Sequence, residues 1–579
     1  MIATLLALSL VGQAAAQPEP APSPTAAEAS TAPARTPEPD TALASPAEPA
    51  PATDVPLAAA APPPTDASAA PPTDAAAAGT EKRDVVPKFI KGELSTYLGA
   101  DRLVVKNTRI GVSAGIDRFG DTYYLLVEPL VDLRFLDAKL GLGFGVPLRI
   151  ELVSLEMDPA TGNPKLTQNI GRIRKEDWDS FHDFGRILKY VTYGKKEDPL
   201  YVSVGQRYAS SIGHGAITRR YSPNIDIDYP RVSAEVDAYN RFGGFELMVN
   251  DVLAWNQLSG IAFLKPLSFF NPAGEAARSF SIGVSGGLDW AAPYNLVVMD
   301  GLRQLDDQHR LITENKPVGI VGIDAEVKVV KTEHVDLKPY VDFSMLVGGD
   351  FGVTGGLLGR FNVGQETVNA FRVVVEARYL GSRYAPSYFD TFYEVDRFVF
   401  RELPRVDPAV ANYVPKQRYL LENGLGQRFG YYLEGSWGIP GAVGLTLALQ
   451  GVSNSPATDF VAHLEVPVLS FFQIFGSYYL RGVESWSELG FQADQGVLGL
   501  FGNKAIAFAG ARLKILPFLF INGRLYKTFR MNPDLKRYDN QVGFVVDVEI
   551  GYEFRKKTEM RPPNASAFGA SARSAYAER

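Results

Sequence analysis

Apolar and polar residues alternate along much of the chain, most regularly in residues 543–554, GFVVDVEIGYEF. Side chains of one parity there are apolar, and Asp547 and Glu549 lie on the other parity. Because successive side chains of a β-strand point to opposite faces, the segment predicts a strand with one apolar face and one largely acidic face.

The same alternation recurs upstream, in residues 337–345, 371–380, 443–450, 460–466, 472–481 and 519–527, with further candidates back to 108. Most segments are about 9 to 13 residues long, which a tilted strand needs to cross a hydrocarbon layer. A soluble sandwich would show shorter strands, of about 5 or 6 residues. Arg372, Glu376 and Asp342 place charges deep within the polar faces.

The connections between these segments fall into two classes. Short turns are expected at 362–369, 439–441, 466–470 and 515–518. Longer connections are expected at 207–230, 291–316, 381–427, 484–498 and 530–541. Short turns at one end and long loops at the other are typical of transmembrane β-barrels.

Residues 88–554 therefore resemble a Gram-negative outer-membrane β-barrel, porin-like in organisation, with no narrower family indicated. The last strand resembles the assembly signal of such proteins, and Tyr552 and Phe554 form its aromatic end. The resemblance implies an all-β, antiparallel transmembrane barrel of about 18 or 20 strands. It also implies outer-membrane lipid and the barrel-assembly machinery as partners. Residues 555–579 depart from the pattern, because such barrels normally stop at the aromatic residue.

The two ends of the chain have a different composition. Residues 1–16 read as a signal peptide, with an apolar stretch followed by Ala14–Ala16, although no Lys or Arg precedes the stretch. Residues 17–87 read as a disordered, acidic Pro/Ala-rich linker, and residues 555–579 as a disordered tail. We expect both to lie in the periplasm. The linker is either a solvated spacer or a tether that reaches peptidoglycan.

Composition excludes several classes of function. The chain has no cysteine and a net charge of -7, so thiolate chemistry is excluded and a nucleic-acid partner is not expected. The five histidines form no catalytic or metal-binding pattern. Asp226 and Asp228 give only a weak suggestion of calcium. We expect no enzymatic activity, no cofactor and no metal.

Strand parity places charged side chains in the barrel lumen. A lumen of this kind favours polar or charged solutes, unless the charges serve only to make the interior polar. The lumen candidates are Arg372, Glu376, Arg378, Arg512, Lys514, Arg524, Asp547 and Glu549.

The 381–427 connection is long and dense in aromatic and charged residues. It either folds inwards as a constriction, caps the outer mouth, or forms a packed lid. The constriction candidates are Arg383, Asp390, Glu394, Asp396 and Arg397. Upstream, residues 176–201 predict an amphipathic helix, with Phe181, Phe184, Ile187, Leu188 and Val191 on one face.

Two functions fit these observations. The first is porin-like passage of small polar or charged solutes through the lumen. The second is a binding or structural role in the outer membrane, in which the surface loops contact a partner and the linker reaches the cell wall.

Overall fold

The computed structural model describes residues 108–554, apart from 137–138, 158–163, 167–169, 195, 197, 208, 272–273, 275–276, 300–301, 365–368, 403–412, 440–442, 467–470, 485–504 and 533–535. The predicted signal peptide, linker and tail, and the region 88–107 assigned to the barrel, lie outside the described residues.

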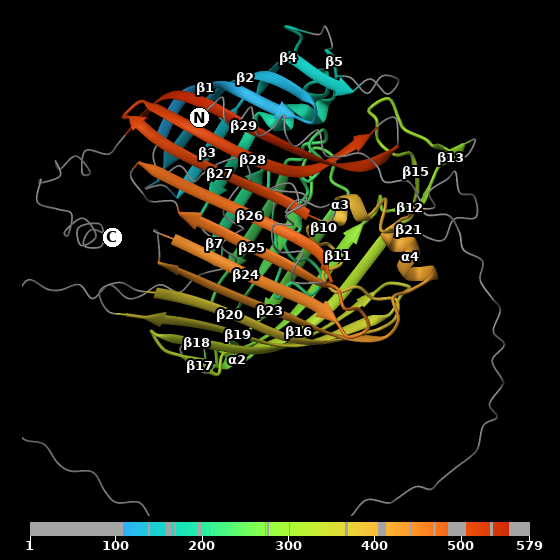
Figure 1. Cartoon of the computed structure of the whole chain (residues 1–579). Helices are drawn as coiled ribbons and strands as arrows, with labels where there is room; N and C mark the ends of the chain where they lie inside the picture. The colour runs from blue at the N-terminus through green and yellow to red at the C-terminus, as the bar shows by residue number, and fades with distance from the viewer. Residues whose placement is uncertain are drawn as a thin grey trace, which may run out of the picture. The chain divides into compact units, whose positions relative to one another are not determined.

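Twenty antiparallel strands form a closed barrel (Figure 1). The first ten are β1 (Thr108–Phe119), β2 (Thr122–Phe135), β3 (Leu140–Gly145), β6 (Leu188–Tyr193), β7 (Leu200–Gly205), β8 (Ser233–Tyr239), β9 (Gly243–Val249), β10 (Gln257–Leu264), β11 (Phe280–Asp289) and β16 (Val318–Val327). The second ten are β18 (Val335–Leu346), β19 (Phe351–Val363), β20 (Asn369–Leu380), β23 (Arg428–Ile439), β24 (Val443–Val452), β25 (Thr458–Val466), β26 (Phe472–Val483), β27 (Ala505–Leu516), β28 (Leu519–Asn532) and β29 (Arg537–Phe554).

The barrel closes where the first strand meets the last. β1 and β29 pair from Thr108 opposite Phe554 to Phe119 opposite Gly543. With an even number of strands, the two strand ends at Thr108 and Phe554 lie at the same end of the barrel. We call this the turn end and the opposite one the loop end. The prediction of 18 or 20 strands is confirmed at 20.

The outer surface of the barrel is apolar. Along β29, Val546, Val548 and Ile550 are exposed, whereas Asp547 and Glu549 are almost fully buried. The other strands repeat this division, with many exposed Val, Leu, Ile and Phe side chains. An exterior of this kind is stable in hydrocarbon, where a closed barrel leaves no unpaired strand edge. The outer-membrane-type barrel predicted from the alternation is therefore confirmed.

Shorter elements extend the wall or lie in the connections. β4 (Leu148–Met157) continues β3 along β2, β5 (Pro164–Leu166) pairs with β4, and β17 (Val330–Lys331) pairs with β18. The connections hold η2 (Lys175–Asp177), η3 (Phe181–Arg186), α2 (Leu267–Phe270), β12 (Pro293–Leu296), β13 (Val298–Met299), β14 (Leu302–Arg303), β15 (Thr313–Asn315), α3 (Tyr393–Asp396), β21 (Arg401–Glu402), β22 (Tyr413–Val414) and α4 (Lys416–Glu422).

The amphipathic helix predicted in residues 176–201 is wrong. Two short 3-10 helices, η2 and η3, occupy 175–186, and Leu188 already begins strand β6. β6 pairs with β3 on one side and β7 on the other. Because the edges of β3 and β7 must be paired for the barrel to close, tertiary pairing overrides the helical spacing of the apolar residues.

The predicted long loop at 530–541 is also wrong. β28 continues to Asn532 and β29 begins at Arg537, so the two strands form a hairpin. Cross-strand partners hold its tip, including Asn532 Nδ2, which donates to Asp539 Oδ2 at 2.8 Å. A polar sequence thus forms a strand extension here, because its side chains bond one another across the ladder.

Among the described residues, no helix is both long and apolar enough to cross a membrane.

Candidate functional site

Two connections at the loop end fold into the barrel lumen. We call residues 206–232 the first plug segment and residues 381–402 the second. They pair directly: Phe389 N donates to Ile217 O at 3.1 Å, and Arg219 N donates to Phe389 O at 3.1 Å. Gly213 and Gly215 have φ angles of 55° and 82°, which lets the first segment reverse direction before this pairing.

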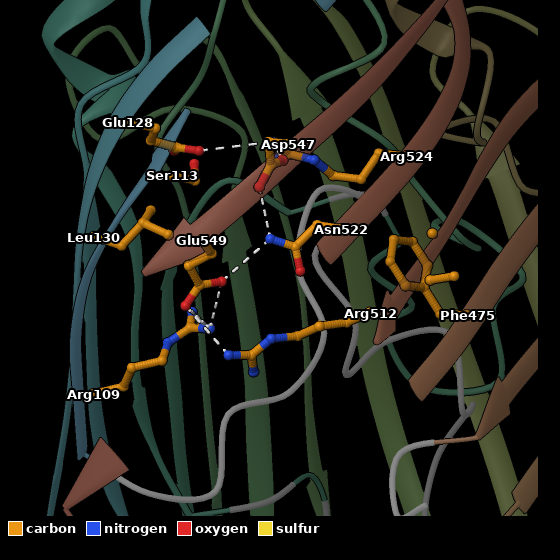
Figure 2. A pocket seen from close by; sticks show the side chains of 12 residues that line it. Arg109, Ser113, Glu128, Leu130, Phe475, Arg512, Asn522, Arg524, Asp547 and Glu549 are labelled. Atoms are coloured by element: carbon orange, nitrogen blue, oxygen red, sulfur yellow. Dashed lines mark hydrogen bonds and ion pairs between the residues drawn. The ribbon is translucent and has the colours of Figure 1, made fainter. Parts of the chain in front are cut away.

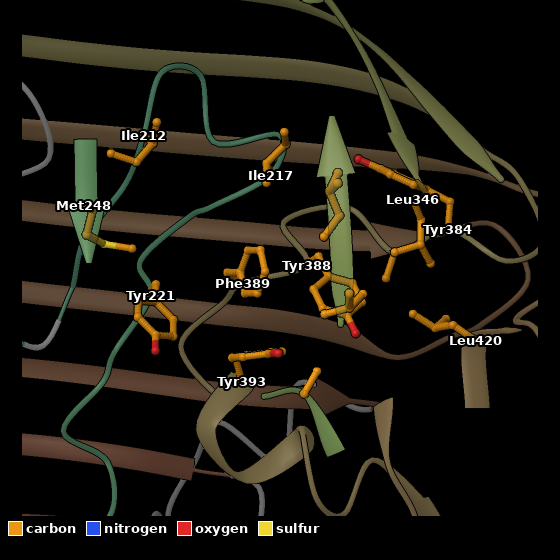
Figure 3. Packing of buried hydrophobic residues seen from close by; sticks show 14 of the residues in the cluster. Ile212, Ile217, Tyr221, Met248, Leu346, Tyr384, Tyr388, Phe389, Tyr393 and Leu420 are labelled. Carbon is orange, nitrogen blue, oxygen red and sulfur yellow. The ribbon is translucent and has the colours of Figure 1, made fainter. Parts of the chain in front are cut away.

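An apolar cluster packs the two segments against each other and against the wall (Figure 3). Tyr221, Phe389 and Tyr393 are fully buried there, and the Phe389 and Tyr393 rings lie edge-to-face with centroids 4.8 Å apart. The segments therefore form a packed plug within the lumen.

Arginines of the first segment bind carboxylates of the wall. Arg219 Nη2 donates to Glu376 Oε1 of β20, and Arg220 Nη2 donates to Glu434 Oε2 of β23, each at 2.6 Å. Burial of both partners in each pair makes removal of one partner costly. Arg219 also lies 3.8 Å above the centroid of the Tyr432 ring.

The second segment is held by a further buried network. Arg397 Nη2 lies 3.1 Å from Asp289 Oδ2 at the end of β11, and Tyr393 Oη donates to the same oxygen at 2.7 Å. Glu394 accepts from Tyr221 and lies 2.9 Å from Arg231 of the first segment. The Glu394 pKa is lowered, because the charges of Arg231 and Arg397 outweigh burial.

The first segment is also joined to β28. Phe529 N donates to Ile225 O at 2.9 Å, and Ile227 N donates to Phe529 O at 3.2 Å. Asp228 lies between Arg174 at 2.5 Å and Arg530 at 2.7 Å. Burial, together with the charge of Asp228, raises the pKa of Asp226 to about 6. The weak calcium suggestion at Asp226 and Asp228 gains no support, since Asp228 is paired with arginines.

Among the described residues, side chains of the lumen line three hollows. The turn-end hollow, of about 470 Å³, is lined by charges of β1, β2, β27, β28 and β29 (Figure 2). Glu549 is its central acceptor: it lies 2.9 Å from Arg109 and 3.2 Å from Arg512. Asn522 Nδ2 donates to Asp547 Oδ1 at 2.7 Å.

The middle hollow, of about 870 Å³, lies farther from the turn end than the first hollow does. Glu128 and Arg524 line both this hollow and the turn-end one, so the two are neighbours along one side of the lumen. Asn224 and Asp226 of the first plug segment also line it.

The loop-end hollow, of about 490 Å³, lies between both plug segments and strands β23–β26. Arg219 and Arg220 of the first segment, Phe392 of the second, and Arg481 of β26 line it. It shares no lining residue with the other two hollows.

An apolar cluster borders all three hollows. Phe475 lines the turn-end hollow, Phe508 the middle one, and Phe392 the loop-end one. We call this cluster the apolar septum; its members are Ile225, Phe392, Val395, Phe475, Tyr479, Ile506, Phe508 and Phe529. An apolar constriction between polar compartments can block solutes by excluding water.

The structure places the eight lumen candidates in two groups. Arg512, Lys514, Arg524, Asp547 and Glu549 lie together near the turn end, with Lys514 3.5 Å from Glu553. Arg372, Glu376 and Arg378 lie by the plug: Arg378 pairs with Glu376 at 2.5 Å, and Arg372 pairs with Glu434. Their role in selectivity stays a prediction.

Four of the five constriction candidates come together inside the lumen. Asp390 and Asp396 lie 3.8 Å and 2.8 Å from Arg481, and Glu394 lies 3.4 Å from Arg397. Arg383 does not join them: its side chain is 45% exposed and lies 3.5 Å from Asp350, in the β18–β19 turn.

Tyr552 and Phe554 are exposed on the outer surface, with ring centroids 4.9 Å apart. Their role in assembly stays a prediction. The sequence patterns did not predict the roles of Arg219, Arg220 and Asp289, or the septum. The first plug segment is as rich in Arg, Asp and Tyr as the 381–427 connection, and that composition was the available signal.

Comparisons with known proteins add little to this geometry. No family model matches the chain, and no curated protein matches it.

Solved structures of outer-membrane proteins show a distant likeness. A mutant of the ferric enterobactin receptor PfeA from Pseudomonas aeruginosa is 8% identical over 78% of this chain and 81% of that chain, with a TM-score of 0.30. The siderophore receptor PirA from the same organism has the same values. Wzi, an outer-membrane, carbohydrate-binding β-barrel involved in group 1 capsule assembly in Escherichia coli, is 10% identical over 78% and 85%, with a TM-score of 0.27. At these values we infer nothing about ligand or mechanism from them.

Proposed function

We propose that this protein passes small polar or charged solutes across the outer membrane by a gated route through its lumen, with the turn end in the periplasm. The turn-end and middle hollows form the inner part of the route, and the loop-end hollow forms the outer part. The proposal assigns the protein no catalytic role.

One observation carries the proposal: the apolar septum contributes side chains to a hollow with charged lining residues near the turn end and to another near the loop end. Ile225, Phe392 and Val395 belong to the plug segments, whereas the other members belong to wall strands. A shift of the plug would therefore separate the two halves of the septum and join the hollows. The wild-type barrel should conduct rarely, because an intact septum excludes water.

The test is a single-channel recording in a planar bilayer on the purified full-length chain. The variant carries Ile225→Ser and Phe508→Ala, which make the septum more polar and smaller. We expect conducting events at least about tenfold more frequent than in the wild type, which corresponds to about 1.4 kcal/mol in the gating equilibrium.

Ile217→Ala is the matched control. Ile217 is an equally buried plug residue, but it lies in the apolar cluster of the plug rather than in the septum. Its conductance should stay at the wild-type level. The proposal is wrong if the septum variant folds, as shown by a change in its gel mobility on heating, inserts into the bilayer, and conducts no more than this control.

A second function is supported by the extent of plug packing. A plug fixed by buried ion pairs and two apolar clusters suits a closed barrel that binds a partner with its surface loops. A peptidoglycan pull-down with and without residues 17–80 tests the contact with the cell wall. This function would be favoured if peptidoglycan binds the protein only when residues 17–80 are present and the septum variant shows no conductance.

A further inference from the structure

The two arginines that bind the plug to the wall, Arg219 and Arg220, also contribute to the lining of a hollow. Arg219 and Arg220 both line the loop-end hollow, and Gln450, Asp459 and Arg481 line it from positions near the loop-end limits of β24, β25 and β26. The hollow is therefore the outermost of the three.

Positive charge is in excess beside this hollow. Glu376 is paired with Arg219 and Arg378, and Glu434 is paired with Arg220 and Arg372. Four arginines thus meet two carboxylates, an excess of two positive charges. The neighbouring group is balanced, because Asp390 and Asp396 face Arg481 and Lys416. Among the charged residues that line the hollow itself, Arg219, Arg220 and Arg481 face Asp390 and Asp459, which leaves one positive charge in excess.

Arg219 has hydrogen-bonding capacity left. Its Nη2 donates to Glu376 and to the carbonyl oxygen of His214, whereas its Nη1 is buried and has no hydrogen-bond partner in the part of the chain that the structure describes. A buried guanidinium group with an unsatisfied donor is costly unless a ligand accepts from it. Carboxylates and phosphates are the acceptors that suit a guanidinium best, and a carboxylate carries the single negative charge that matches the excess of one positive charge.

Aromatic and aliphatic side chains make up much of the remaining lining. Phe392, Tyr432 and Tyr479 line the hollow, and the Arg219 and Arg481 guanidinium groups lie 3.8 Å and 4.0 Å above the Tyr432 and Phe392 rings. One face of each of these guanidinium groups is thus covered by a ring. Aromatic walls favour a ligand with an apolar or aromatic body.

We propose that the loop-end hollow is a recognition site for a small organic carboxylate, with Arg219 as its main anchor. The inference rests on the proposed function and names the solute class at the outer part of that route. The site is coupled to the gate, because Phe392 belongs both to the hollow and to the septum. A carboxylate bound to Arg219 also competes with Glu376 and so loosens the plug.

Benzoate is the probe, and benzamide is its neutral counterpart of nearly the same shape. Binding to the purified full-length barrel is measured by isothermal titration calorimetry. We expect benzoate to bind and benzamide to bind at least about tenfold more weakly, since only benzoate brings the charge that complements the arginines. Equal binding of the two, or no binding of benzoate, overturns the inference without any variant.

Arg219→Gln should weaken benzoate binding by at least about tenfold. Arg360→Gln is the matched control, because Arg360 is a buried arginine of β19, 3.5 Å from Asp336, that lines none of the three hollows; it should leave benzoate binding unchanged. If Arg219→Gln does not fold, Arg219→Lys keeps the charge but removes the forked donor and should show the same loss. Unchanged binding in the Arg219 variant overturns the assignment of the anchor.

Conductance separates this inference from the proposed function. Benzoate should increase the frequency of wild-type channel events, and Arg219→Gln should abolish that increase. If septum variants stay silent while benzoate still binds through Arg219, the route is wrong and the site stands. If septum variants conduct but benzoate does not bind, the route stands and the site is wrong.

Discussion

The barrel has two unlike walls. Six consecutive strands, β3 and β6–β10, have 6 to 8 residues each, and we call them the short wall. The other fourteen strands have 9 to 18 residues and form the long wall. At about 3.3 Å per residue, a six-residue strand is only about 20 Å long, which is short for a tilted membrane crossing.

The difference shows how a plug can be made from the barrel's own chain. β7 ends at Gly205, and the chain then enters the lumen as the first plug segment instead of continuing the wall. η3 closes the space that is left: Gly185 lies against Val232, and His182 lies 3.3 Å from Asp251. The long wall, in turn, provides Glu376, Glu434 and Phe529, which hold the plug. One wall therefore supplies the plug, and the other anchors it.

The largest expected effect is loss of the buried charge network in the short wall. Glu235 of β8 lies 2.5 Å from Lys196 and is also paired with Arg207, which has no other carboxylate within ion-pair distance among the described residues. Glu235→Gln should therefore cost about 3–5 kcal/mol of unfolding free energy, measured by urea titration in detergent.

Asp132→Asn is the comparison on the long wall. Asp132 is equally buried, but its partner Arg109 keeps Glu549 at 2.9 Å. We expect a loss of only about 1–3 kcal/mol. Equal losses in the two variants would contradict the idea that short strands depend more on their buried charges.

Arginine on the outer face should also distinguish the walls. Val375 lies in the middle of the twelve-residue β20 and is 45% exposed, and Leu247 lies in the seven-residue β9 and is 42% exposed. Val375→Arg should cost about 2–4 kcal/mol, and Leu247→Arg less than about 2, because charges near an interface cost less. Reversible refolding into lipid vesicles gives both values. A cost for Leu247→Arg as large as that for Val375→Arg would place the short wall as deep in hydrocarbon as the long one.

A smaller effect is expected from pH at the contact between plug and long wall. Burial raises the pKa of Asp226 to about 6, so the folded state favours its neutral form. The pKa of Asp226 in the unfolded chain is about 4. Ionisation of Asp226 therefore costs the folded state no stability below about pH 4, costs progressively more between about pH 4 and 6, and reaches its full cost above that. The plug should be seated more firmly at pH 5 than at pH 7. Asp226→Asn should reduce this difference, measured as the pH dependence of thermal stability, whereas an unchanged pH profile would assign it to other groups.

The smallest effect is expected outside both walls. Arg310 and Asp306 form an ion pair at 2.8 Å in the exposed β14–β15 connection. Arg310→Ala should change the unfolding free energy by no more than about 0.5 kcal/mol, in the same urea titration. A larger loss would mean that this connection supports the barrel.

The alternation of residues was enough to predict the long wall. In β29 or β20 each side chain faces either the lipid or the lumen. Because successive side chains of a strand point to opposite faces, the alternation of apolar and polar residues shows directly which face each one takes. It was less informative for β6, where Leu188 and Val191 continue a helical spacing that begins at Phe181. There the partner strands β3 and β7 decide the structure, and β3 is separated from β6 in the sequence by the segment that holds β4, β5, η2 and η3.

The plug could not be predicted for the same reason. Arg219 is 157 positions from Glu376, and Tyr221 is 173 positions from Glu394. Density of arginine, aspartate and aromatic residues indicated that 381–427 has a structure of its own, and it could have indicated the same for 206–232. Which carboxylate each arginine meets depends on barrel curvature and strand number, which local patterns do not contain.

The seam between β1 and β29 has a consequence for biogenesis. Arg109 and Glu549 are 440 positions apart, so the cylinder cannot be sealed until the final strand has been delivered. Two internal stretches of chain must be inside the ring by then, since threading them through a finished wall would break many hydrogen bonds. Long-range pairing of this kind is slow. Closure of the seam is thus the last event of folding. A chain truncated before β29 would leave the barrel open, with the edges of β1 and β28 unpaired and the two plug segments exposed.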